Sequence, residues 1–138
     1  MNEILLKDWI RHSTNDLITA RHLFYEFHPK QTEISCYHCQ QCAEKALKAY
    51  IVFKEEEPEK THNLVLLCQK CMSFDNSFFE ILKTCTMLLP FAAAVRYPNE
   101  LSPDDYIAKQ AIDNAQKLYD FCIQKITESG IVLSQSSS

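Results

Sequence analysis

Glycine is almost absent from this 138-residue sequence, which contains only Gly130. β-Hairpins, glycine-rich phosphate loops and the turns of dinucleotide-binding sheets all need residues that accept a positive φ angle, and glycine does so most readily. The scarcity of glycine therefore argues against all three. Apolar residues recur at intervals of three and four instead of alternating, which indicates a helical protein.

An export signal and a membrane-spanning stretch are also missing. The chain starts MNEILLKDW, without the basic start and apolar core of a secretory signal. The longest apolar run, residues 87–95, is too short to cross a bilayer and contains Pro90. Seven cysteines, an odd number with no export signal, predict reduced thiols in a cytoplasmic protein.

The sequence has no excess of positive charge, since its formal net charge is −4. This value gives no overall attraction to nucleic acid or anionic lipid, so binding of either would need a local patch. The length suits one domain with a core of its own. The serine-rich end, residues 129–138, is expected to be a flexible tail.

Helix breakers divide the first part of the chain into two helical segments. Residues 4–27 follow the helical period and end before Pro29. Asp16 lies off the apolar stripe of this segment, together with Arg21 and His22, so we expect all three on a solvated face. The second segment, residues 33–53, ends in a run of like charges followed by proline.

Three further helices are predicted in the second half. Thr61 offers an N-cap for the first of them, which would put His62 in its opening turn as a neutral, hydrogen-bonding imidazole. Residues 77–89 form the next segment. The last one has the clearest start, with an N-cap hydroxyl at Ser102 and a proline after it, and it ends at Gly130.

The second segment carries a line of polar side chains through apolar surroundings. At about 100° per residue, Tyr37, Gln41, Glu44 and Lys48 fall within about 60° of one another. One interpretation is a structural network, because Glu44 and Lys48 form a favourable (i, i+4) pair. The other is that Gln41, Lys45 and Lys48 point into a groove and meet an anionic ligand. Spacing leaves both interpretations open.

Two cysteine pairs have the ligand count of a zinc site: Cys36 with Cys39, and Cys68 with Cys71. Both pairs lie inside helical patterns, whereas structural zinc pairs usually sit on tight turns. Cys39 also falls on the apolar side, where cysteine behaves as a small hydrophobe. We therefore predict no metal and no cofactor. A cysteine nucleophile is not indicated either, because Cys36 and His38 project in different directions from one helix.

The polar residues of the second segment form a recognisable set with two later motifs. The set is Tyr37-x3-Gln41-x2-Glu44-Lys45-x2-Lys48-Ala49, then Thr61-His62-Asn63-Leu64, then Arg96-Tyr97-Pro98. It resembles the HEPN domain over about residues 4 to 127. The resemblance implies an all-α fold, an up-and-down bundle of four to five helices over residues 1–128. It also implies a homodimer, often encoded beside a minimal nucleotidyltransferase, with a groove associated with nucleotide or RNA binding.

Carried over by position, the resemblance implies that several polar side chains converge in that groove. These ligand-binding candidates are Tyr37, Gln41, Glu44, Lys45, Lys48, His62, Arg96 and Tyr97. The residue types suit a nucleotide, because arginine offers a bidentate fork for phosphate, lysine a mobile point charge and tyrosine a stacking face.

One motif of the HEPN ribonucleases is absent. Those enzymes resemble one another in an arginine followed four to six residues later by a catalytic histidine. After Arg96 the matching positions are Leu101, Ser102 and Pro103, and no histidine follows His62. We therefore predict a non-catalytic binding module. The alternatives are a metal-independent ribonuclease of the toxin type, using His62 and Arg96, and an assembly scaffold without a ligand.

Overall fold

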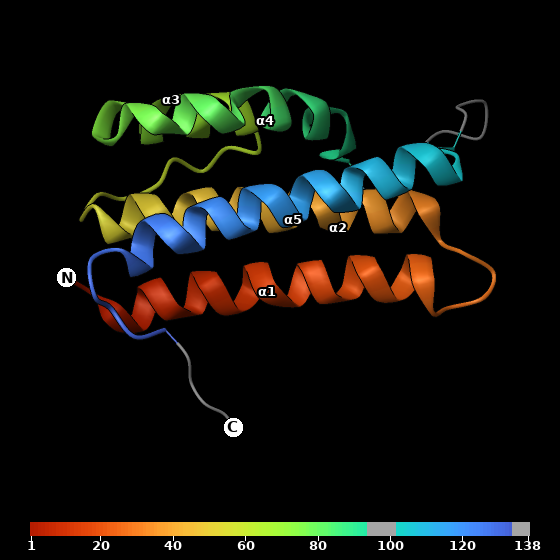
Figure 1. The fold of residues 1–138 in the computed structure, drawn as a ribbon, viewed down its shortest axis with the longest axis horizontal. Helices are drawn as coiled ribbons and strands as arrows, with labels where there is room; N and C mark the ends of the chain where they lie inside the picture. Colours follow the sequence, from red (N-terminus) through yellow and green to blue (C-terminus); the bar gives the residue numbers. More distant parts are fainter. Residues whose placement is uncertain (94–101, 134–138) are drawn as a thin grey trace.

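The computed structural model describes residues 1–93 and 102–133, which form a helical bundle (Figure 1). The helices are α1 (Glu3–Tyr25), α2 (Thr32–Phe53), α3 (Leu64–Phe74), α4 (Leu82–Leu88) and α5 (Asp105–Thr127). Two short 3₁₀ helices, η1 (Asn76–Ile81) and η2 (Leu89–Phe91), flank α4. These two ranges contain no β-strand, so the prediction of an all-α bundle is confirmed.

Helix α2 runs through the centre of the bundle, and 14 of its 22 residues are buried. Helix α1 lies along one side of it, α3 and α4 cover the opposite side, and α5 packs along the front of α2 between them (Figure 1). Small side chains let α1 and α2 approach closely. Ser13 of α1 donates to the carbonyl oxygen of Cys42 over 2.7 Å, and Ser35 of α2 donates to that of Ala20 over 2.8 Å.

The segment between α2 and α3 runs back along the bundle, so that α3 points in the same direction as α2 (Figure 1). Three contacts fix this arrangement. Before α3 begins, the side-chain amide of Gln40 donates to the carbonyl oxygen of His62. Within α3, the thiol of Cys71 donates to the carbonyl oxygen of Leu47. Further along, the rings of Tyr50 and Phe74 are in contact. Residue 62 is therefore returned to the first half of α2.

Two predicted N-caps lie too early in the chain. Asn63, not Thr61, caps α3, because its side-chain oxygen accepts from the backbone N–H groups of Val65 and Leu66. His62 consequently precedes the helix instead of opening it. Asp104, not Ser102, caps α5. In both places two capping residue types follow closely on one another, and the later one lies next to the first helical turn.

Two helix ends show how the chain manages with one glycine. Gly130, after α5, has a φ angle of 93°, as expected for a residue that ends a helix. After α2 the same left-handed region is occupied by Glu55, at φ 64°. The backbone N–H of Glu56 then closes the helix on the carbonyl oxygen of Ile51. Helix α2 therefore ends before Pro58 is reached.

All seven cysteines are buried as free thiols. The two predicted pairs lie on α2 and α3, where Cys68 donates to the carbonyl oxygen of Phe78. In residues 1–93 and 102–133 no three potential metal-ligating side chains come together. Within the same ranges, no helix has the length and apolar character needed to cross a membrane.

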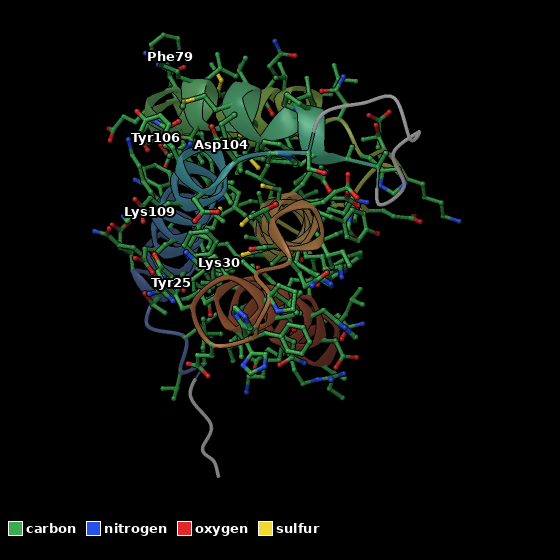
Figure 2. The ribbon with its side chains drawn as sticks, turned by 90° about the vertical axis from the view of Figure 1, so that its right-hand side faces the viewer. Tyr25, Lys30, Phe79, Asp104, Tyr106 and Lys109 are labelled. Atoms are coloured by element: carbon green, nitrogen blue, oxygen red, sulfur yellow. The ribbon has the colours of Figure 1, made fainter. Side chains whose placement is uncertain are left out.

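The two phenylalanines of η1 divide between the core and the surface. Phe78 is fully buried against Tyr50 and Phe121, whereas its neighbour Phe79 is exposed. Seen end-on, Phe79 and Tyr106 point outward from the bundle (Figure 2).

Candidate functional site

The carboxylate of Glu44 is buried on α2 and accepts three hydrogen bonds. Its Oε2 accepts from Nζ of Lys48 over 2.9 Å, and its Oε1 accepts from Nδ1 of His62 over 2.9 Å and from Nε2 of Gln40 over 3.3 Å. Gln41 donates to the side-chain oxygen of Gln40 over 2.7 Å. These five residues form the Glu44 cluster. Because a carboxylate only accepts, the Nδ1 atom of His62 carries the proton.

Glu44 stays ionised in this cluster. Burial acts to raise the pKa of Glu44, but the hydrogen bonds from His62 and Lys48 outweigh burial and lower the pKa below its usual 4.5. At the centre of the polar line predicted on α2 there is thus one anion, the carboxylate of Glu44, surrounded by hydrogen-bond donors.

A second buried carboxylate belongs to Asp16 of α1, which faces α2. Its Oδ1 accepts from Nδ1 of His38 over 2.8 Å and its Oδ2 accepts from Nζ of Lys45 over 2.6 Å. Burial acts to raise the pKa of Asp16, yet the bonds from His38 and Lys45 prevail and lower it. These three residues form the Asp16 cluster.

The expectation that Asp16 lies on a solvated face is therefore wrong, while Arg21 and His22 are exposed as expected. A signal was available in the sequence. Asp16 lies three residues after the buried Ser13 and four before the buried Ala20, which places it beside the apolar stripe. His38 was not a predicted site residue, because its partner is 22 residues away on another helix.

The structure brings some of the predicted site residues together and separates others. Gln41, Glu44, Lys48 and His62 share the Glu44 cluster. Lys45 turns toward α1 and binds Asp16 instead.

The aromatic and guanidinium candidates are placed differently. Tyr37 is half-buried, with its ring centroid 5.5 Å from that of His38. Arg96 and Tyr97 lie outside the described residues, so their convergence with α2 remains a prediction.

A pocket of about 440 Å³ lies beside these clusters, between α1 and α2. It is lined by Leu5, Asp8, Trp9, His12 and Lys45. The Nζ atom of Lys48 lies 5.6 Å from the centroid of the Trp9 ring. Trp9 thus connects the pocket to the Glu44 cluster, and Lys45 connects it to the Asp16 cluster.

Several donors of this region are not used up by the two carboxylates. An ammonium group has three N–H donors, and Lys45 and Lys48 each give one to a carboxylate. The side chain of His62 is 73% exposed although its Nδ1 is bound. A buried carboxylate on Nδ1 fixes the orientation of an imidazole, so its other nitrogen is directed at solvent or a ligand. The arrangement suits recognition of an anion.

The fold and this polar central helix define a class of small, all-α bundle domains. Residues 6–126 match the family model of the HEPN domain, and the chain belongs to the HEPN family. No curated protein matches the chain.

Two solved structures have similar folds. The crystal structure of ST0689, an archaeal HEPN homologue, shares 26% identity over 88% of this chain and 97% of its own, with a TM-score of 0.66. The crystal structure of TT1696 from Thermus thermophilus shares 22% identity over 91% of this chain and 99% of its own, with a TM-score of 0.75. The second likeness concerns the fold alone.

Proposed function

We propose that this chain is a non-catalytic HEPN module that binds a nucleotide or an RNA phosphate and acts as a homodimer with a nucleotidyltransferase partner. The observation that supports it most is the pairing of two buried carboxylates with two lysines and two histidines on one side of α2. The carboxylates hold the cations in place, and the remaining donors of the more exposed Lys45 and His62 are available to phosphate oxygens.

The local charge supports a phosphate ligand only in part. Lys45 and Lys48 are each balanced by one carboxylate, so the two lysines leave no net positive charge in the clusters. Phosphate binding therefore needs a further cation, which in this proposal is Arg96, with His62 as a hydrogen-bond donor. Arginine suits this role because its guanidinium binds phosphate in a bidentate manner.

A nucleotide-binding assay tests the proposal. Thermal stability of the wild type should rise with a panel of nucleoside triphosphates, since a ligand that binds only the native state stabilises it. Arg96→Ala and Lys45→Ala should each lower the nucleotide affinity obtained from these shifts by about 10-fold or more. This is the loss expected for a charge-assisted contact worth ~1.5–3 kcal/mol. Lys109→Ala is the matched control, because Lys109 is an exposed lysine of α5. No response to any nucleotide or RNA would leave the scaffold alternative.

The second candidate is a metal-independent ribonuclease, and one observation favours it. Glu44 orients the exposed imidazole of His62 in the way that a carboxylate orients a general base. RNA cleavage by the purified protein in the presence of a chelator, abolished in His62→Ala, would support this candidate. Intact RNA under the same conditions would support the binding module.

The homodimer and the partner need separate measurements. HEPN domains often dimerise, which supports the homodimer. Sedimentation of the purified chain should give twice the monomer mass of 16.0 kDa. Co-purification with the product of an adjacent nucleotidyltransferase gene would support the proposed partnership.

A further inference from the structure

We propose that the pocket between α1 and α2 holds the base of the bound nucleotide, with Trp9 as its stacking surface. The inference rests on the proposed function and adds to it, because it assigns Trp9, Asp8 and His12 to ligand recognition. None of these residues belongs to the polar line of α2.

The lining of the pocket suits a heteroaromatic ring. The indole of Trp9 and the side chain of Leu5 give apolar walls, and Asp8, His12 and Lys45 add polar groups. A few polar groups in a mainly apolar pocket of about 440 Å³ are typical of small-molecule sites. Trp9 is half-buried, and its indole N–H has no hydrogen-bond partner among residues 1–93 and 102–133. Stacking needs only the face of the base, so an aromatic wall accepts every base.

The pocket lies within reach of the proposed phosphate-binding groups. Lys45 lines the pocket, and its ammonium donates to Asp16 over 2.6 Å. The ammonium of Lys48 lies 5.6 Å from the centroid of the Trp9 ring and 2.9 Å from Glu44. A ligand with its base against Trp9 would have Lys45 beside its sugar and phosphates, whereas Lys48 is 8% exposed and stays bound to Glu44. One nucleotide can therefore contact the pocket and Lys45 together.

A purely structural role for Trp9 is the competing explanation. The ring contacts a lysine ammonium, which is a favourable cation–π geometry in its own right. The two roles differ in one respect: a packing residue affects stability, whereas a stacking residue makes binding depend on the presence of a base.

The chain provides its own reporter, because Trp9 is its single tryptophan. Tryptophan fluorescence and thermal stability are measured together during titrations with ATP, GTP, CTP, UTP and inorganic triphosphate. We expect nucleoside triphosphates to change the fluorescence and to bind at least 5-fold tighter than inorganic triphosphate. Equal binding of nucleotides and triphosphate would overturn the base pocket and leave phosphate binding intact. Absence of binding by all five ligands, and by single-stranded RNA in the same assay, would overturn the base pocket and the proposed function together.

Variants separate stacking from packing. Trp9→Leu should weaken nucleotide binding by about 5- to 150-fold, the range that corresponds to loss of one aromatic stack, while its affinity for triphosphate stays unchanged. Trp9→Phe should recover most of the nucleotide affinity. Tyr106→Leu removes an exposed aromatic ring on α5 and is the control. Equal loss of nucleotide and triphosphate binding in Trp9→Leu would show a structural role and refute the pocket.

Discussion

The Asp16 and Glu44 clusters use the same three groups in different structural settings. In each, one buried carboxylate accepts from Nδ1 of a histidine and from the ammonium of a lysine. Asp16 joins two helices, since its partners lie 22 and 29 residues further along the chain on α2. Glu44 binds a lysine of its own helix and a histidine from the segment that returns along the bundle.

Exposure separates the clusters further. The side chain of Lys48 is 8% exposed and that of Lys45 is 24% exposed, so only Lys45 can regain water after losing its partner. The histidines show the opposite order, with His38 at 26% and His62 at 73%. The Glu44 cluster therefore has both the more buried lysine, Lys48, and the more exposed histidine, His62.

Acid should produce the largest effect, because it removes both anions. The pKa values of Asp16 and Glu44 lie below their usual 3.8 and 4.5, so the unfolded chain binds protons that the native state does not. Stability is complete above these values and is lost as the pH falls from about 5 through the lowered native values. Urea unfolding between pH 7 and pH 3 measures this loss. The double variant Asp16→Asn/Glu44→Gln should show a flatter pH profile, and an unchanged profile would contradict the assignment.

Removal of the Glu44 carboxylate should be the most damaging single change. Glu44→Ala leaves the ammonium of Lys48 buried without its partner, and breaking a buried pair costs about 3–5 kcal/mol of unfolding free energy. Chemical denaturation measures it. Glu44→Leu/Lys48→Met is the control, because replacing both charges by apolar groups of similar size restores most of the loss. A double variant as unstable as the single one would show that packing, not charge, is responsible.

The matching change in the other cluster should cost less. Asp16→Asn keeps the shape and removes the charge that holds His38 and Lys45, which we expect to lower the unfolding free energy by about 1.5–3 kcal/mol. The cost is smaller because Lys45 reaches solvent. Asp113→Asn, at an exposed lysine pair on α5, should change stability by less than about 0.5 kcal/mol. Equal losses at Asp16 and Glu44 would remove the distinction between the clusters.

The histidines should give the smallest effects, in the order of their burial. His38→Ala should lower stability by about 1 kcal/mol, as expected for one partly buried hydrogen bond. His62→Ala should change it by less than about 0.5 kcal/mol, since most of the ring is in water. Thermal unfolding of both variants tests the order. A larger loss at His62 would mean that its ring supports the fold and is not reserved for a ligand.

Local signals in the sequence were enough for the helices, whereas their arrangement as a bundle was implied by the resemblance to the HEPN domain. Helical periodicity and proline placement predicted both ends of α1 and of α2 to within two residues. The polar line of α2 was also readable, because Glu44 and Lys48 are four residues apart on one helix.

Contacts between helices were not readable in the same way. The bonds of Asp16 to His38 and Lys45 depend on how α1 faces α2, and no periodicity within one helix fixes that orientation. The bond of His62 to Glu44 depends on the path of a ten-residue connection that has no regular structure. No helical period predicts such a path, and the approach of His62 to Glu44 was implied only by the resemblance of the Thr61-His62-Asn63-Leu64 motif to the HEPN domain.

The seven buried thiols make opening of the bundle measurable. They are distributed over α2, α3, α4 and α5, and burial raises the pKa of the Cys42 thiol to about 12. Only the exposed thiolate reacts with alkylating reagents, so each cysteine is modified when its own helix separates from the core. Mass spectrometry of the alkylated peptides would then rank these helices by the free energy needed to detach them.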